Sequence, residues 1–394
     1  MSASRLARRR AVVGCAAALA ASLAACTAPA STVTVSGKSL AIYASEPPGS
    51  PPAQSSDVLD AEQLALAQAG GRVGNFAIRF VPLHGAKISD NARAAIQDKT
   101  AIAYLGEIPP GASADSLGIT NALDLLQVTP TDTAIALTQA TPAVPGAPNN
   151  YYESLKSYGR TFARVVPTAA QEAKAQVHEM QKLHVSKLYA ASDGSQYGAA
   201  IAHAVQQDAA GAGISAVEGA AAAAKFSASG ADALFIGSAS DSVAAPLVRD
   251  VAASNPTAKI FAPSALDTDG FAADVTPARV ALYVSAPGFL PRDLSAAGQS
   301  FVSAFTSAYG HAPSPQAIFG YEAMSAVLSV LREAGSAANN RSTVVKDFFS
   351  IAARNSVVGT YSINADGDIS IAPFVFSRYV NGSFVPFTTI QVQG

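Results

Sequence analysis

Short apolar runs alternate along this chain with longer stretches of helical pattern, and residues 101–133 show this alternation most clearly. The segment begins with AIAYLG, an apolar run closed by Gly106, which is typical of a buried strand. GASADSLGITNAL then has a helical pattern, and LLQVTP is a second apolar run. A strand, a helix and a strand in this order predict one unit of a parallel sheet flanked by helices.

The loops that follow these two strands are the first candidate site. In an open parallel sheet, loops at the carboxyl ends of neighbouring strands face the ligand crevice, so residues 107–111 and 131–133 should lie side by side. Small residues at Gly111 and Ala112 leave the backbone N–H groups of a helix start open to a ligand. The candidates here are Pro110, Gly111, Ala112, Thr131, Asp132 and Thr133.

The same alternation occurs in the rest of the chain and restarts after residue 186. Further strands are expected at 39–45, 76–83, 187–192, 233–238, 259–265 and 280–287. The last third is mostly helical and ends in hairpins, with strong turn signals at Asp366-Gly367 and Asn381-Gly382. The predicted fold class is α/β, with two lobes that each contain a mostly parallel sheet flanked by helices, joined by a multi-strand hinge.

The N-terminal segment is typical of an export signal. Residues 5–10 contain four arginines, and the apolar stretch AVVGCAAALAASLAA that follows is short for a membrane span. It ends in Leu23-Ala24-Ala25-Cys26, which resembles a bacterial lipobox with acylation of Cys26. The alternative is an ordinary secretory signal. Either reading predicts an extracytoplasmic protein, and the first predicts anchoring to the cell membrane through a flexible tether at 27–38.

Composition excludes several classes of protein. Both cysteines, Cys15 and Cys26, fall within the predicted signal, so no disulfide is expected in the mature body. With 49% hydrophobic residues, the body has enough apolar material to form two cores. Without the four signal arginines, 22 basic residues stand against 28 acidic ones, and no basic stripe is visible, which argues against a nucleic-acid partner.

No pattern points to catalysis, a cofactor or a metal. The histidines are scattered at His84, His178, His184, His203 and His311. There is no zinc-ligand spacing, G-x-S-x-G elbow or P-loop. Asp193 and Asp366-Gly367-Asp368 are similar to fragments of calcium loops, but the other ligand positions of an EF-hand are missing, so turns are expected there.

Several segments together resemble the leucine/isoleucine/valine-binding proteins, solute-binding proteins of branched-chain amino-acid ABC transporters with the type I periplasmic binding fold. They are LAIYASEPPGSPPAQSSDVLDAEQLALAQAGG, AYLG to TPTDT, FARVVPT, DGSQYG, ALFIGS, FGYEAMSAVLSVL and VVGTYSINADGD. The resemblance implies a monomer that captures a small-molecule ligand between its lobes, closes and delivers it to permease and ATPase subunits. The expected lobes are 39–162 plus 287–360 and 163–286 plus 361–394, after a signal at 1–26.

Applied residue by residue, the resemblance implies an altered pocket. Thr133 corresponds to a threonine that holds the ligand head group, and Tyr197 to a tyrosine that covers the ligand. Pro110 replaces a carboxylate-binding serine, and Ser264 replaces the acid that pairs with the ligand ammonium. Ser238 marks the position of a lost aromatic residue, and Phe289 completes the candidate set. Because charged hydrogen bonds contribute about 1.5 to 3 kcal/mol each, their loss makes a zwitterionic amino acid a less secure ligand.

Two pairs of alternatives stay open. Glu46, Glu107 and Asp132 either project toward the rim of the first lobe and favour a cationic or hydroxyl-rich ligand, or Asp132 caps the next helix and the glutamates are solvated. The whole protein is either the capture subunit of an importer or a non-transport relative that senses a ligand for a membrane partner or binds nothing in the cleft.

Overall fold

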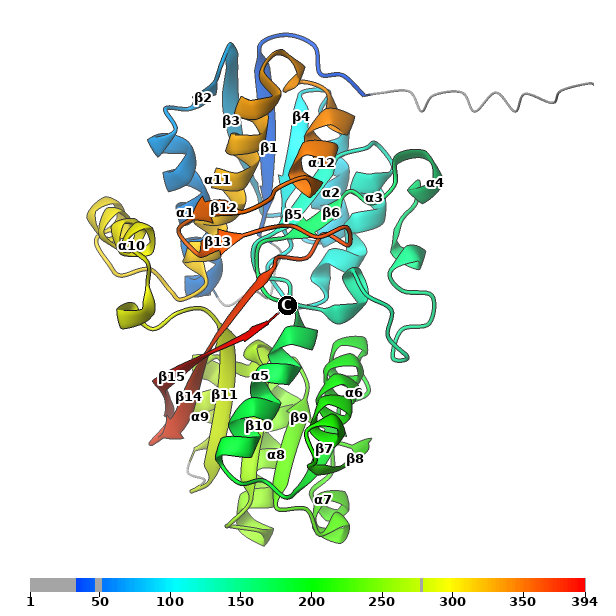
Figure 1. Cartoon of the computed structure of the whole chain (residues 1–394), viewed down its shortest axis with the longest axis vertical. Helices are drawn as coiled ribbons and strands as arrows, with labels where there is room; N and C mark the ends of the chain where they lie inside the picture. The colour runs from blue at the N-terminus through cyan, green and yellow to red at the C-terminus, as the bar shows by residue number, and fades with distance from the viewer. Residues whose placement is uncertain (1–32, 47–51, 277–278, 394) are drawn as a thin grey trace, which may run out of the picture. The chain divides into compact units, whose positions relative to one another are not determined.

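The computed structural model describes residues 33–46, 52–276 and 279–393. The predicted signal peptide, Cys26 and most of the tether at 27–38 lie outside these ranges. No helix in the described ranges is both long enough and apolar enough to cross a membrane. Two α/β lobes make up the described chain, which confirms the predicted fold class (Figure 1).

The first sheet is buried on both faces. Leu40 and Ile42 of β1 pack into the core with helices α1 and α11, whereas Ala41 and Tyr43 point to the opposite face, toward α2. Successive side chains of a strand alternate between faces, so a strand covered on both sides is a continuous apolar run, as SLAIYAS is. The strands are, in spatial order, β2 (Arg72–Val73), β3 (Phe76–Leu83), β1 (Ser39–Ser45), β4 (Ala101–Leu105), β5 (Leu126–Thr129) and β6 (Phe162–Arg164).

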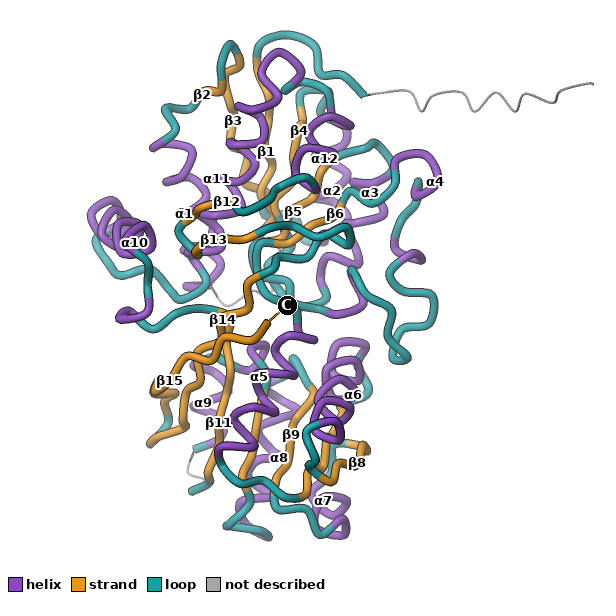
Figure 2. The backbone as a smooth tube through the Cα atoms, viewed as in Figure 1, coloured by secondary structure: helices purple, strands orange, loops and turns teal. Residues whose placement is uncertain are grey.

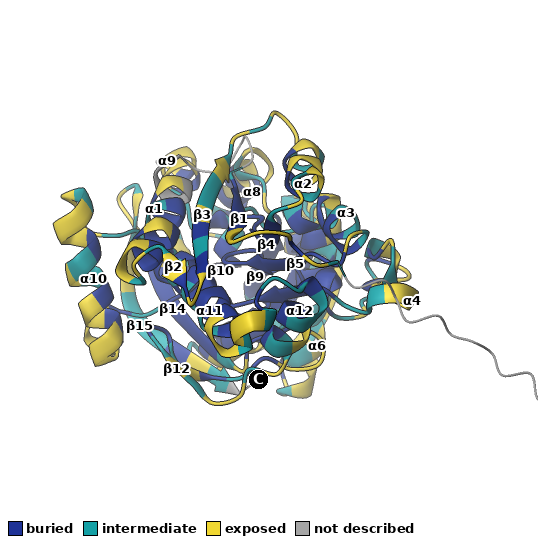
Figure 3. Ribbon diagram, turned by 90° about the horizontal axis from the view of Figure 1, so that it is seen from above, coloured by how far each residue is buried: buried dark blue, intermediate teal, exposed yellow. Residues whose placement is uncertain are grey.

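Helices from both ends of the chain cover this sheet. Only β2 is antiparallel, and the other neighbouring strands pair in parallel. The helices are α1 (Pro52–Gln68), α2 (Ile88–Gln97), α3 (Leu117–Asn121), α4 (Leu155–Tyr158), α11 (Ala317–Ala334) and α12 (Arg341–Phe349). Figure 3 shows the strands buried inside and exposed residues on the outer sides of these helices.

The predicted helix at 111–123 is divided in the structure. A short 3-10 helix, η1 (Ala112–Asp115), precedes α3. Serine side chains near the break bond to the neighbouring strand ends: Ser113 Oγ accepts from the N–H of Glu107, and Ser116 Oγ accepts from Gln127. Short polar side chains that bond locally compete with regular helix formation.

The second sheet repeats the design and adds a hairpin. Strands β7 to β11 pair in parallel, β14 runs antiparallel to β11, and β15 runs antiparallel to β14. Figure 2 shows β14 and β15 beside β11. The spatial order of the strands is β15 (Ser383–Gln393), β14 (Ile371–Val380), β11 (Ala281–Pro287), β10 (Lys259–Ala262), β9 (Ala233–Gly237), β7 (Lys187–Ser192) and β8 (Ser215–Ala220). The helices are α5 (Ala169–Lys182), α6 (Gln196–Gly211), α7 (Ala223–Ser229), α8 (Asp241–Ser254) and α9 (Asp269–Val275).

Three segments of the described chain connect the two lobes: 165–168, 288–295 and 362–370. Helix α10 (Ala296–Tyr309) follows the second of them, and the two-stranded ladder of β12 (Arg354–Ser356) and β13 (Gly359–Tyr361) precedes the third. The lobe boundaries expected from the sequence near 162, 286 and 360 stay a prediction.

A buried arginine fastens the third connection to the first lobe. Arg164, at the end of β6, is fully buried, and its Nε lies 2.9 Å from Oδ1 of Asp368. Its other nitrogens donate to the carbonyls of Asp132 and Ala134 and to Oγ1 of Thr138. Asp368 also accepts from Thr138. One side chain therefore holds the loop after β5 and the turn before β14 together.

Replacing Arg164 with methionine should lower the free energy of unfolding by about 3 to 5 kcal/mol, because Asp368 would be left as a buried charge without its partner. Urea unfolding followed by circular dichroism measures this change. Arg93→Met is the control, since its ion pair with Asp90 is exposed and 3.7 Å long, and it should cost less than about 1 kcal/mol. Equal effects of the two substitutions would contradict the assignment.

Candidate functional site

A polar cleft of about 650 Å³ lies between the strand ends of the two sheets. Loops after β4 and β5 line it from the first lobe, and loops after β9 and β10 line it from the second, which is where ligands bind in open α/β sheets. Its lining consists of Ile108, Pro109, Pro110, Thr131, Thr133, Ala239, Ser240, Asp241, Ser242, Ser264, Ala265, Thr268, Asp274 and Gln316.

Asp132 organises the first-lobe side of this cleft from beneath. Its Oδ1 accepts from the backbone N–H groups of Gly111, at 2.6 Å, and Ala134, at 3.1 Å. Its Oδ2 accepts from the N–H of Ser113 at 2.9 Å, and the residue is fully buried. Burial raises the pKa of Asp132, whereas the hydrogen bonds from these amides and the positive charge of Arg164 lower it by a smaller amount. Asp132 therefore caps the start of η1. It bonds to Ala134, which directly precedes the 3-10 helix Ile135–Leu137, and not to an N–H group of that helix, so the predicted cap of the next helix is not formed.

The other two acids of the rim hypothesis do not line the cleft. Glu107 is completely buried, where it accepts from Ser45 at 2.5 Å and from Tyr104 at 2.6 Å, so neither a rim position nor solvation was right. Glu46 is half-buried and pairs with His84 at 2.9 Å. The acids of the rim hypothesis therefore bond to other side chains of the protein and do not line the cleft.

In the second lobe, Glu172 is the buried acid that bonds to a loop of the cleft, as Asp132 is in the first lobe. It lies in the first turn of α5, is fully buried, and accepts from both the N–H of Ser264 at 2.6 Å and its hydroxyl at 2.9 Å. Ser285 donates to the same carboxylate at 2.6 Å. Burial raises the pKa of Glu172 to about 7, although the hydrogen bonds from Ser264 and Ser285 act to lower it. The sequence places Glu172 in a helix far from the strand ends, so sequence reasoning missed it.

Thr133 and Tyr197 bring two hydroxyl groups together at the cleft. Thr133 comes from the loop after β5, and Tyr197 from the first turn of α6 in the other lobe. The two hydroxyls lie beside each other and beside Ser264. In the described part of the chain, neither oxygen has a hydrogen-bond partner of good distance and angle, although both side chains are at least nine-tenths buried. Such oxygens are candidate ligand contacts.

Tyr197 reaches this place because α6 begins very close to β9. A Cβ atom at Gly198 would lie only 2.4 Å from the carbonyl oxygen of Gly237, so glycine is needed at this contact. Asp193 forms the preceding turn, since its Oδ1 accepts from the N–H of Ser195 at 2.9 Å. The hydroxyl of Ser238 donates to the other oxygen of Asp193, at 2.7 Å.

The structure brings some of the predicted site residues together and separates others. Pro110, Thr131, Thr133 and Ser264 line the cleft. Gly111 and Tyr197 line a small adjacent cavity of about 20 Å³, and Ala112 begins η1. Asp132 and Ser238 are buried in the hydrogen bonds described above. Sequence reasoning missed Asp241, Thr268 and Gln316. Asp241 could have been found, because it follows the end of β9, and ligands bind at the carboxyl ends of parallel strands (the strand-end rule).

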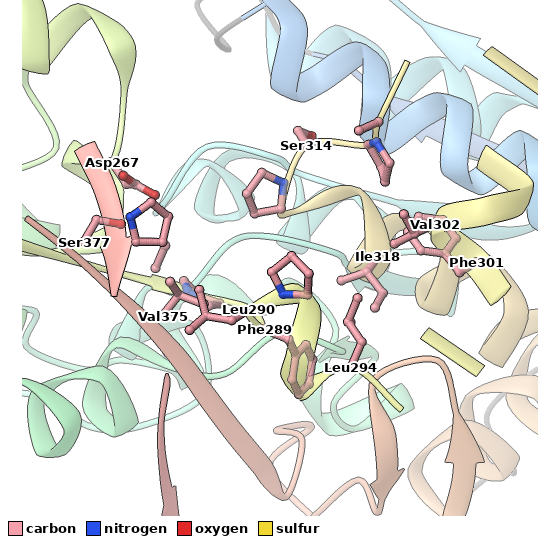
Figure 4. Close-up of a pocket in the computed structure, with 17 residues that line it drawn as sticks. Asp267, Phe289, Leu290, Leu294, Phe301, Val302, Ser314, Ile318, Val375 and Ser377 are labelled. Atoms are coloured by element: carbon pink, nitrogen blue, oxygen red, sulfur yellow. The ribbon is translucent and has the colours of Figure 1, made fainter. Parts of the chain in front are cut away.

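Phe289 lies elsewhere, in a second pocket of about 270 Å³ (Figure 4). This pocket lies along the connection 288–295 and is lined mostly by apolar side chains and prolines. Asp267 and Ser377 lie at one end of it, and Phe301 and Val302 at the other. The structure therefore does not bring Phe289 to the cleft. Among the residues with described side chains, no cluster of three or more His, Cys, Asp or Glu could hold a metal ion.

These features define a two-lobed α/β protein with a cleft between the strand ends of its two sheets. The model of the periplasmic binding protein family matches residues 48–381, so the chain belongs to that family. A search of curated protein sequences found no match.

Solved structures share the type I periplasmic binding fold. A leucine-binding protein from Thermotoga maritima is 19% identical, with a TM-score of 0.73 over 89% of this chain and 98% of that one. A branched-chain amino acid transporter substrate-binding protein from Streptococcus pneumoniae, in complex with isoleucine, is 17% identical, with a TM-score of 0.69 over 91% and 100% of the chains. A solute-binding protein of an ABC transporter from R. palustris, in complex with benzoate, is 17% identical, with a TM-score of 0.67 over 91% and 98%.

The buried Glu107 should make stability depend on pH. Burial raises its pKa from 4.5 to about 7 in the folded protein. The unfolded chain then loses this proton first as the pH rises, so stability that is fully present below about pH 4.5 is lost as the pH passes 7. Between pH 5 and 8, wild type should lose about 2 kcal/mol more free energy of unfolding than Glu107→Gln does. Urea unfolding across this pH range tests the difference, and parallel curves would contradict it.

Proposed function

We propose that this protein is the extracytoplasmic solute-binding subunit of an ABC importer and that it binds a small polar molecule between its lobes without transforming it. The observation that carries the proposal is the pair of unpartnered hydroxyls, Thr133 from one lobe and Tyr197 from the other, beside a polar cleft. The cleft volume of about 650 Å³ lies within the usual range for small-molecule sites. Family membership and the ligand-bound ABC transporter proteins of the same fold support the same function.

Capture would proceed by closure of the lobes around the ligand. The connecting segments supply backbone positions that can absorb a hinge rotation, as in two-lobed binding proteins generally. A ligand that bonds to Thr133 on one side and to Ser264 or Tyr197 on the other would stabilise the closed arrangement, because only that arrangement offers both sets of contacts. The closed monomer would then be recognised by the permease and ATPase subunits.

A second candidate function is a non-transport relative that senses a ligand for a membrane partner or binds nothing in the cleft. Pro110 favours it, since a proline in the cleft lining offers neither a hydroxyl nor an N–H to a ligand. Ser264 favours it too, since its N–H and hydroxyl already bond to Glu172. The unpartnered hydroxyls of Thr133 and Tyr197 are the stronger observation and favour transport.

The binding function is tested by a thermal-shift screen of the body from residue 27 onward against amines, amino acids, sugars and aromatic acids. A ligand at a hundredfold excess over its Kd should add about 2.7 kcal/mol of stability. Thr133→Val and Tyr197→Phe should each weaken binding of any hit by about 3- to 10-fold, since each removes one hydrogen bond. Thr306→Val, in the exposed face of α10, is the matched control and should bind as wild type does.

We further propose that Cys26 carries a lipid that anchors the mature protein to the outer side of the cell membrane. The arginine-rich start and the lipobox-like sequence support this. Expressed in a bacterial host, wild type should sediment with the membrane fraction, whereas Cys26→Ala should lose this association. Mass spectrometry of the N-terminal peptide provides a second readout. An unmodified N-terminus after residue 25 would contradict the anchor and favour ordinary secretion.

A further inference from the structure

Two of the helix starts beside the cleft bind a carboxylate of the protein itself. A ligand carboxylate or phosphate is usually held by free backbone N–H groups at such starts. In the first lobe, the amides of Gly111 and Ser113 are taken by Asp132. In the second lobe, the amide of Ser264, which begins a 3-10 helix, is taken by Glu172. An anionic ligand would have to displace a buried internal carboxylate from either position.

The start of α8 supplies a third acid. Asp241 is the first residue of this helix and lines the cleft, so its negative charge compensates the positive end of the helix dipole. Its Oδ2 accepts from Thr268 at 2.9 Å, which orients the carboxylate. The second oxygen of Asp241 stays available to a donor from the ligand. Asp274 adds another carboxylate to the lining and is exposed.

Basic side chains do not balance these acids at the site. Two carboxylates and no Lys, Arg or His belong to the described lining of the cleft. Arg249 donates to the backbone carbonyl of Asp274, but it is not part of the lining. The residues at 47–51 and 277–278, whose placement is not described, have no charged side chain in the sequence. The cleft therefore attracts positive charge and repels negative charge.

The lining also limits the type of cation. It contains no aromatic residue among its described members, so a quaternary ammonium would find no ring faces to stack on. Its polar side chains are two carboxylates, which only accept hydrogen bonds when ionised, and hydroxyls and one amide, which can accept as well as donate. Among these hydroxyls, the buried oxygen of Thr133 has no hydrogen-bond partner of good geometry, and the buried oxygen of Tyr197 beside it is a further group that can accept from a ligand. This set of groups matches a cation that carries N–H donors.

We propose that the cleft binds an organic cation with N–H donors, a primary amine or guanidine that has no carboxylate or phosphate, with Asp241 and Asp274 pairing with its charge. This inference rests on the proposed function as a solute-binding protein. It differs from the zwitterionic amino acids suggested by the resemblance, because the amides of Gly111, Ser113 and Ser264 are already occupied by Asp132 and Glu172, and the start of α8 carries the carboxylate of Asp241.

The test is a calorimetric and thermal-shift comparison of probes that differ in charge. Amines are represented by putrescine, agmatine, ethanolamine and leucinamide. Choline, leucine, benzoate and xylose represent quaternary, zwitterionic, anionic and neutral compounds. Leucinamide and leucine share one side chain, so this pair isolates the carboxylate. Ethanolamine and choline share one hydroxyl and one positive charge, so this pair isolates the N–H donors. We expect binding to be confined to the amines.

The other outcomes separate this inference from the proposed function. Binding of leucine, benzoate, choline or xylose without tighter binding of any amine would overturn the cation assignment and leave the solute-binding function intact. No binding in any class would contradict the solute-binding function, and the cation assignment would fall with it.

Charge removal provides the second measurement. Asp241→Asn keeps the shape of the side chain and should weaken binding of the best amine by about tenfold, the effect of losing a charged hydrogen bond. Asp250→Asn, on the exposed face of the same helix, should change the affinity less than about twofold, as expected of a distant exposed charge. Ligand-free melting temperatures verify that both variants fold. Unchanged amine affinity in Asp241→Asn would overturn the role of this residue.

Discussion

The guanidinium of Arg164 is the interaction on which the geometry of the first lobe's rim depends. It is buried at the end of β6, and it bonds to the carbonyls of Asp132 and Ala134 while it pairs with Asp368. The loop after β5 is thereby held in one conformation, with Thr133 toward the cleft and Asp132 underneath. Because Asp368 belongs to a segment that crosses between the lobes, the same charge pair also ties the hinge to the binding loop. Movement of the hinge would therefore act directly on the residues that line the site.

In both lobes a buried carboxylate accepts hydrogen bonds from backbone N–H groups beside the cleft, but the two carboxylates come from unrelated positions in the fold. Parallel strands followed by helices point backbone N–H groups at the cleft, and such groups attract anions. In one lobe Asp132, from the neighbouring strand end, accepts these hydrogen bonds, and in the other Glu172, from a helix, does so. Burial raises the pKa of both carboxyls because it disfavours their charged form. The hydrogen bonds that the carboxyls accept favour the charged form and offset part of this increase. At these two helix starts the amides are therefore not free to bind a ligand.

Family membership defines the architecture of this protein more closely than it defines the ligand. The solved structures with the same fold were obtained with ligands as different as isoleucine and benzoate, at identities below one fifth. At this distance the scaffold is what the structures are shown to share, and a shared fold does not define a ligand. The cleft of this chain has proline and serine where the resemblance implied polar and acidic groups, and carboxylates on other elements. Specificity therefore has to be argued from the residues present here.

Much of the fold could be predicted from sequence, because it depends on local patterns. The alternation of apolar runs and helical stretches determined the two parallel sheets, and the runs at 39–45, 101–105 and 187–192 became strands within a residue or so of their expected bounds. The strand-end rule also placed Pro110, Thr131 and Thr133 at the cleft. The direction in which a side chain points after a strand ends is not contained in such patterns, which is why Glu107 and Asp132 were expected at the rim and are buried.

What the sequence by itself determined is therefore the class of fold and the strand ends of the first sheet that line the cleft. Only the tertiary structure decided that Glu172, from α5, lies against Ser264, that Thr133 and Tyr197 leave their hydroxyls without partners, and that Phe289 belongs to a different pocket. The physical reason is that strand and helix periodicity depends on neighbours in the chain. The contact between Glu172 and Ser264 instead joins groups that are 92 residues apart in the chain, which only the packing of the second lobe brings together.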